Sequence, residues 1–163
     1  MNLILLHSNE LIWQGDSDSR IESAEAILKG RRFLHIQSVH KAEIGDLLRV
    51  GVINGSTGTG AVKHIDSNSI TLNVILHQHE PPPPLPVTLL LALPRPKMLR
   101  RIIQSATSMG VKKIILLNSY KVEKSFWQSP YLEPASIKEQ LILGLEQAMD
   151  LYLIQISERT RPY

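Results

Sequence analysis

The chain has 163 residues and no cysteine. Without cysteine it cannot form a disulfide scaffold, a cysteine nucleophile, a thiolate zinc site or an iron–sulfur cluster. The absence fits a reducing cytoplasm, where we expect the protein to function. Long apolar runs are also missing, because the longest stretches, 87–93 and 114–117, are far too short to span a bilayer. We therefore expect a cytoplasmic protein with no membrane partner.

Proline is absent before residue 81 and then occurs as the cluster PPPPLP at 81–86. Because proline lacks an amide hydrogen and fixes φ, this cluster is predicted to be an extended linker. A ligand for a proline-binding domain is the alternative. Seven of nine glycines and all six histidines precede the cluster, so the two halves differ in kind. We predict two domains, residues 1–80 and 87–163, joined by the linker.

The first half is predicted to be a small β-barrel, because several short strand-like segments are separated by tight turns. Expected strands cover residues 2–7, 47–53, 61–65 and 69–76, and expected helical turns cover 23–28 and 32–39. The glycine-rich segment at 55–60 suggests a phosphate loop, but the lysine-serine or lysine-threonine pair that should follow it is missing. Asn54 and Gly55 between two strands favour a hairpin instead.

The second half is predicted to alternate strand and helix. Residues 87–93 form a continuous apolar run, typical of a strand covered on both faces, and 113–117 is predicted to be a second buried strand. Apolar residues recur with helical spacing from Lys97 to Met109, and Gly110 is expected to end that helix. A second helix over 135–149 and a third strand over 151–156 complete a mainly parallel sheet.

Acidic residues are nearly missing from 90–124, where eight lysines and arginines accompany one glutamate. The cations fall on the loop after one predicted strand, on the first turns of the next helix and on the loop after the next strand. Loops at the carboxyl ends of parallel strands lie side by side, where ligands bind. A solvated helix face is the alternative. The candidate phosphate-binding residues are Arg95, Lys97, Arg100, Arg101, Lys121 and Lys124.

Aromatic residues gather in the same loop region, at Tyr120, Phe126, Trp127 and Tyr131. Aromatic rings beside cations favour nucleic-acid binding, because rings stack on bases while cations contact phosphates. For Trp127, packing in the core is an equally good interpretation. His77 and His79 lie two residues apart but have no evident third ligand nearby, so we expect solvated edge residues and no metal site.

Three segments and several single positions carry a family resemblance. The segments are LLLALPRPKMLRRIIQ at 89–104, NSYKVEKSFWQSP at 118–130 and EQLILGLEQ at 139–147. They resemble the RsmE family of 16S rRNA uridine-N3 methyltransferases, of the SPOUT (trefoil-knot) class. In the first half, His35-Ile36, Val39, Lys41 and Gly45-Asp46 resemble the family's PUA-like barrel.

The match covers nearly the whole chain, with two local departures. His40-Lys41 stands where the family has Leu-Arg, and Ser108-Met109-Gly110 where it commonly has Glu-Leu-Gly.

The resemblance implies a two-domain protein, with an N-terminal PUA-like β-barrel followed by an α/β SPOUT domain. It implies S-adenosylmethionine as the cofactor, the 16S rRNA of the small ribosomal subunit as the partner, and a homodimer for the full-length protein. The six cations of 95–124 would hold the RNA backbone and the target nucleotide. Arg20 of the first half is a further candidate RNA-binding residue.

The family's cofactor loops, a Gly-Pro-Glu-Gly-Gly segment and a Leu-Gly-x-Arg-Ile-Leu-Arg segment, occur nowhere in this sequence. We expect them downstream of Tyr163, and with them the catalytic residues and the knot. Residues 87–163 are therefore expected to be an incomplete SPOUT domain, with no catalytic and no cofactor-binding residue, and the chain alone is expected to be inactive. The alternative function is a non-catalytic RNA- or ribosome-binding module. A small α/β enzyme unrelated to RNA is a weaker third interpretation, because no catalytic constellation is evident.

Overall fold

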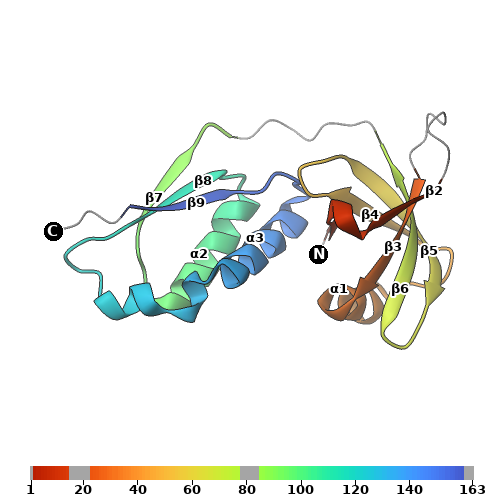
Figure 1. The fold of residues 1–163 in the computed structure, drawn as a ribbon, viewed down its shortest axis with the longest axis horizontal. Helices are drawn as coiled ribbons and strands as arrows, with labels where there is room; N and C mark the ends of the chain where they lie inside the picture. The colour runs from red at the N-terminus through yellow and green to blue at the C-terminus, as the bar shows by residue number, and fades with distance from the viewer. Residues whose placement is uncertain (1, 15–22, 78–84, 160–163) are drawn as a thin grey trace. The chain divides into compact units, whose positions relative to one another are not determined.

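The computed structural model describes residues 2–14, 23–77 and 85–159 (Figure 1). The chain divides into two compact units, residues 2–81 and 82–163. Positions 81–84 of the expected proline linker, and the candidate residue Arg20, lie outside the described residues.

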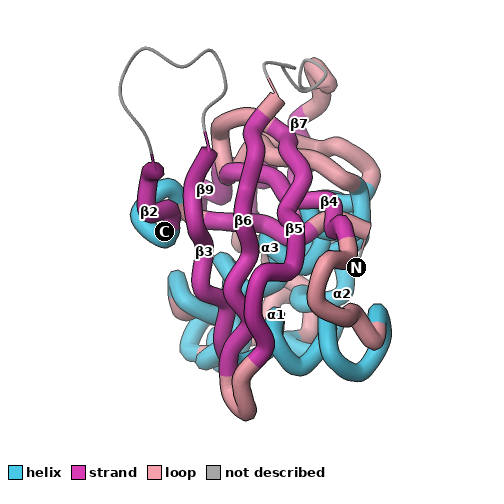
Figure 2. Tube along the Cα trace, turned by 90° about the vertical axis from the view of Figure 1, so that its right-hand side faces the viewer, coloured by secondary structure: helices cyan, strands magenta, loops and turns pink. Residues whose placement is uncertain are grey.

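The first unit is built on a curled sheet of six strands (Figure 2). Its strands lie in the order β1-β4-β5-β6-β3-β2, with β1 and β4 parallel and every other pair antiparallel. The expected barrel is thus observed as a mixed half-barrel whose edges are β1 and β2. The strands are β1 Ile4–Leu6, β2 Leu11–Gln14, β3 Ser23–Lys29, β4 Leu47–Val52, β5 Thr57–Ile65 and β6 Ser69–Leu76.

The expected helical turn at 23–28 is wrong, because these residues form strand β3. Ala24, Ala26 and Leu28 are fully buried and alternate with more exposed residues, which is the period of a strand with one covered face. These residues pair with β6 along their whole length, which identifies them as a strand and not a helical turn. The expected helical turn at 32–39 is confirmed, since α1 spans Gly30–His35 and a π-helical turn, η2, spans Ile36–His40.

The glycine-rich segment belongs to a hairpin, as expected. Asn54 lies in the turn with a φ of 58°, and β5 begins at Thr57. Gly58 therefore lies inside the strand, where an added Cβ would come within 2.4 Å of the Ile75 carbonyl oxygen. Close approach of neighbouring strands in a curled sheet, rather than a phosphate, explains this glycine.

A partly buried ion pair ties helix α1 to the start of the chain. Arg32 forms an ion pair with Glu10, and its Nη1 donates a 2.8 Å hydrogen bond to the Leu5 carbonyl oxygen. Burial raises the pKa of Glu10, but hydrogen bonds from Arg32 and from the His7 amide, together with the positive charge of Arg32, outweigh it and leave that pKa below its usual value.

The second unit alternates strand and helix, as expected. The three strands are parallel and lie in the order β7-β8-β9. Two short 3₁₀ turns, η3 Lys124–Gln128 and η4 Pro130–Leu132, lie between β8 and α3. The elements are β7 Thr88–Ala92, α2 Pro96–Ser108, β8 Lys113–Leu117, α3 Pro134–Ala148 and β9 Gln155–Arg159.

Helices α2 and α3 lie side by side on one face of this sheet (Figure 1). The core is formed by Leu99 and Ile103 of α2, Ile114 and Leu116 of β8, and Leu141 of α3. The expectation that the first strand is covered on both faces is wrong. Strand β7 is an edge strand, and Leu90 on its other face is 62% exposed.

The third strand begins later than expected, at Gln155 rather than Leu151. Leu151 is fully buried, but in the segment that joins α3 to β9. The apolar residue that suggested a strand is therefore a core residue of the connection.

Gly110 ends helix α2, as expected. It follows the C-cap Met109 with a φ of 84°, which favours glycine. Its amide donates to the Thr107 carbonyl at 3.0 Å, and the Val111 amide donates to the Ala106 carbonyl at 3.1 Å. These two bonds form a Schellman motif, which satisfies the last carbonyls of the helix.

The two helices approach each other closely at Gly144 of α3. A Cβ added there would lie 2.5 Å from Thr107 Cβ and 2.7 Å from the Gln104 carbonyl oxygen. Thr107 is fully buried at this contact, and Ser108 Oγ lies 3.4 Å from the Gly144 carbonyl oxygen. A glycine is therefore required for the observed spacing of the helices.

We predict that Gly144→Ala destabilises the second unit by about 1–3 kcal/mol, because the helices must separate to admit the methyl group. Helix propensity alone predicts the opposite sign, since alanine is favoured over glycine by about 1 kcal/mol in a helix. Thermal unfolding followed by Trp127 fluorescence in a Trp13→Phe background measures the effect. Glu139→Ala, at an exposed position of α3, is the control and should leave Tm unchanged. A higher Tm for Gly144→Ala would contradict the packing account.

Candidate nucleic-acid interface

The basic surface begins where strand β7 ends and helix α2 starts. Pro96 is the first residue of α2, where its missing amide hydrogen costs nothing, and Arg95 is the N-cap. Arg95 and Lys97 are exposed, and the first turn contains no acidic residue. The N-terminus is the positive end of the helix dipole, so these cations are repelled by it. The cations and this end of the dipole both attract an anion.

Helix α2 has an apolar face and a cationic face. Leu99, Ile103 and Ala106 are buried in the core. Lys97, Arg100 and Arg101 are separated by three and four residues, so they lie together on the other side of the helix. Helical periodicity therefore holds these cations close together.

A pocket of about 320 Å³ lies at this cationic face. Helix α3 contributes Gln140 to its wall, and the 3₁₀ turn η4 contributes Tyr131. The residues that line it are Lys97, Arg100, Arg101, Gln104, Tyr131 and Gln140. Three of the candidate residues from the sequence are thus brought together in one pocket.

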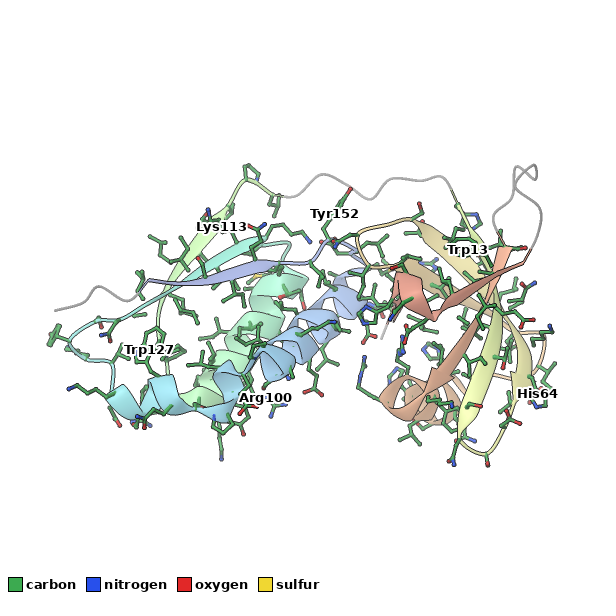
Figure 3. The ribbon with its side chains drawn as sticks, viewed as in Figure 1. Trp13, His64, Arg100, Lys113, Trp127 and Tyr152 are labelled. Atoms are coloured by element: carbon green, nitrogen blue, oxygen red, sulfur yellow. The ribbon has the colours of Figure 1, made fainter. Side chains whose placement is uncertain are left out.

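Tyr131 fixes the position of one of these cations. Arg100 is labelled in Figure 3. Its guanidinium carbon lies 5.2 Å from the centre of the Tyr131 ring, within the range of a cation–π contact. A guanidinium held over a ring keeps the N–H groups along its edge available for a phosphate.

The other candidate residues lie outside this pocket. Arg95 precedes it at the N-cap of α2, and Lys121 and Lys124 are exposed in the segment that follows β8. Lys121 Nζ lies 5.5 Å from the ring centre of its neighbour Tyr120. Among the described residues, no ion pair neutralises any of the six cations, Arg95, Lys97, Arg100, Arg101, Lys121 and Lys124.

Sequence reasoning missed Gln140, which is only 3% exposed. Its Nε2 is buried and has no hydrogen-bond partner in the described structure. Leaving a buried donor unpaired costs about 1–3 kcal/mol. The sequence does contain one signal that could have revealed it. Gln140 lies three residues after Ile137 and four before Gly144, a spacing that places it on the face of α3 that packs inward.

Trp127 packs against the core rather than standing free for base stacking. It is half-buried beside the hydrophobic cluster of the second unit, and its Nε1–H donates to Asn118 Oδ1 at 3.3 Å. Tyr120 differs, since 87% of its surface is exposed. Of the two interpretations of Trp127, the structure favours packing.

The described residues show neither a metal centre nor a membrane span. No group of three or more His, Asp or Glu side chains in them could hold a metal ion. His77 Nε2 lies 3.1 Å from Thr59 Oγ1, and His79 is outside the described residues. None of the helices in this part of the chain is long and apolar enough to cross a membrane.

Comparison with known proteins shows which domain the second unit is similar to. A family model described as an RNA methyltransferase domain matches residues 81–161. Over 165 aligned residues, the whole chain is 28% identical to the Ribosomal RNA small subunit methyltransferase E (RsmE) of Treponema pallidum (strain Nichols). The chain belongs to the RsmE-like RNA methyltransferase family. It spans 59% of the length of that RsmE relative.

Solved structures share the fold of this RsmE-like chain. An RsmE from Neisseria gonorrhoeae, bound to S-adenosyl methionine, matches with a TM-score of 0.70 at 15% identity, over 97% of this chain and 62% of its own. A putative methyltransferase from Legionella pneumophila, in complex with the same cofactor, matches at 0.67 and 12% identity, over 98% and 62%. A predicted RNA methyltransferase from Thermotoga maritima matches at 0.65 and 14% identity, over 100% and 68%.

The different environments of the two aromatic residues predict different effects on stability. Trp127→Ala should lower the free energy of unfolding by about 1–3 kcal/mol, less than the ~3–5 kcal/mol of a fully buried tryptophan. Tyr120→Ala should leave it unchanged, because the ring has few neighbours to lose. Differential scanning calorimetry measures both variants, and equal Tm values for them would refute the packing role of Trp127.

Proposed function

We propose that this chain provides RNA recognition for an S-adenosylmethionine-dependent methylation of N3 of a uridine in 16S rRNA. The observation that carries the proposal is the pocket where Lys97, Arg100 and Arg101 meet, with no acidic partner among the residues that the structure describes. The name of the T. pallidum relative supports rRNA of the small subunit as the substrate. The choice of uridine N3 rests on the resemblance of the segments 89–104 and 118–130.

The proposal extends to the fold and the assembly. The half-barrel of the first unit corresponds to a PUA-like RNA-binding domain, and the parallel unit corresponds to part of a SPOUT domain. The protein acts as a homodimer on the small ribosomal subunit. The TM-scores of 0.65–0.70 to methyltransferase structures support the fold assignment.

The residues of this chain bind and orient the RNA. Each lysine or arginine that meets a phosphate releases a counterion, which supplies affinity that falls with salt. Arg100, held by Tyr131, presents its donors in a fixed direction, whereas Lys121 and Lys124 act as flexible point charges. Arg95 and Lys97 extend the basic surface to the carboxyl end of β7.

S-adenosylmethionine would supply an electrophilic methyl group. Deprotonated N3 of uracil would take this methyl group as the sulfonium C–S bond breaks, and S-adenosylhomocysteine would leave. An apolar pocket of about 390 Å³ between α3 and β9 does not fit this cofactor. Lys138 is its one charged lining residue. The other lining residues are Leu132, Pro134, Ile137, Leu141, Ile154 and Ile156. Such a wall has no acceptor side chain for the adenine amino group or the ribose hydroxyls, so we assign no transfer step to these residues.

A non-catalytic RNA- or ribosome-binding module is the second candidate function. It is favoured by the same pair of observations, a cationic pocket without acids and an apolar pocket without cofactor-binding groups. The two candidates share RNA binding and differ only in cofactor binding.

RNA binding is tested by the salt dependence of affinity. For a short fluorescein-labelled oligouridylate, Arg100→Gln and Arg101→Gln should each reduce the slope of log K against log salt by about 0.7, the value for one phosphate contact on single strands. Lys113 is an exposed cation at the first residue of β8, the end of the strand away from Lys121 and Lys124. Lys113→Gln removes the same charge and should leave the slope unchanged. Slopes that match the wild type in both arginine variants would contradict the proposal.

Cofactor binding tests whether residues 1–163 take part in methyl transfer, and both candidate functions predict that they do not. Isothermal titration of residues 1–163 with S-adenosylmethionine should give no stoichiometric heat. The family's two cofactor loops, Gly-Pro-Glu-Gly-Gly and Leu-Gly-x-Arg-Ile-Leu-Arg, do not occur in these residues. Adding oligouridylate should not change that result. Stoichiometric binding would show that the described pockets hold the cofactor and would overturn this part of the proposal.

A further inference from the structure

Gln140 occupies a position where an apolar side chain is expected. It lies in α3 between Ile137 and Leu141, both of which contact the hydrophobic core, and it is 3% exposed. An apolar residue of the same size would fill this place without burying an unpaired donor. The amide therefore lowers the stability of the free protein, so stability does not explain why a glutamine stands at this position.

The amide forms part of the wall of the cationic pocket. Gln140 lines this pocket together with Lys97, Arg100 and Arg101, while its Nε2 remains unpartnered among the described residues. Rotation about the last side-chain bond of glutamine is soft, so the NH₂ group can turn toward an acceptor in the pocket. The Tyr131 hydroxyl and a second amide, Gln104, add further donors to the same wall.

The pocket thus presents cations and neutral donors, and its lining contains no carboxylate. Its ligand must carry negative charge and several acceptor oxygens. A phosphate group meets both demands, because its two non-bridging oxygens share the negative charge and each can accept hydrogen bonds from more than one donor. A volume of about 320 Å³ leaves room for part of the attached nucleotide.

We propose that this pocket is a binding site for one phosphate group of the RNA strand, and that Gln140 Nε2 donates a hydrogen bond to it. The proposal rests on the proposed RNA-binding function and adds a specific contact. The arginines and Lys97 provide charge, and the amide provides the directed donor that fixes the position of the phosphate. Binding satisfies a group that is unsatisfied in the free chain.

Gln140→Met removes the amide and preserves side-chain volume. It should weaken oligouridylate binding about ten- to a hundredfold, the size of one hydrogen bond to a charged group, with the salt slope unchanged because no charge is lost. Its Tm should equal or exceed the wild-type value, since the unpaired donor is gone. Gln155→Met, exposed on β9, is the control and should leave both quantities unchanged.

Wild-type affinity for Gln140→Met would overturn the proposal. So would a loss of affinity together with a lower Tm, because the amide would then be a structural group. These outcomes concern Gln140 alone. Failure of the wild-type chain to bind oligouridylate would contradict the proposed function instead.

A second measurement decides the chemistry of the site without a variant. In ¹⁵N-edited NMR spectra, uridine monophosphate should shift the side-chain amide signals of Gln140, and uridine should not. Equal shifts with both ligands would assign the pocket to the base and overturn the phosphate assignment. The same titration remains decisive if oligouridylate affinity is too weak to measure.

Discussion

The close contact between helices α2 and α3 is the constraint on which the second unit depends. At Gly144 the backbone of α3 lies so near to Thr107 and the Gln104 carbonyl that no side chain fits between them. This contact places both helices on the same face of a three-stranded parallel sheet. It also brings Gln140, one turn earlier in α3, to the pocket at the cationic face of α2. The pocket exists because the helices are this close.

Helix α2 combines two functions that would otherwise compete. Its apolar face completes the core through Leu99 and Ile103, so the helix is anchored by burial. Its opposite face can then hold Arg100 and Arg101 close together, although like charges repel. That repulsion and the unpaired amide of Gln140 lower the stability of the free chain. Both penalties are relieved by an anion, which is the pattern expected of a binding site.

The sequence predicted the elements best where periodicity and end signals agree. Helix α2, with Pro96 at its start and Gly110 after its end, was predicted within a residue or two. Strand β3 was missed because short alternation with alanines resembles a helical pattern until its partner β6 is known. The two-sided burial predicted for β7 failed because a continuous apolar run does not show that a strand lies at an edge. Gln140 could not be found because its role depends on residues of another helix.

The central claim is that RNA binds at the cationic face of α2, with α3 and the turn η4 as neighbours. Hydrogen–deuterium exchange of the whole chain, with and without oligouridylate, tests this most directly. The account predicts that RNA slows exchange mainly in residues 95–104 and 130–141. Protection confined to the strands of the first unit, with these two segments unchanged, would contradict it.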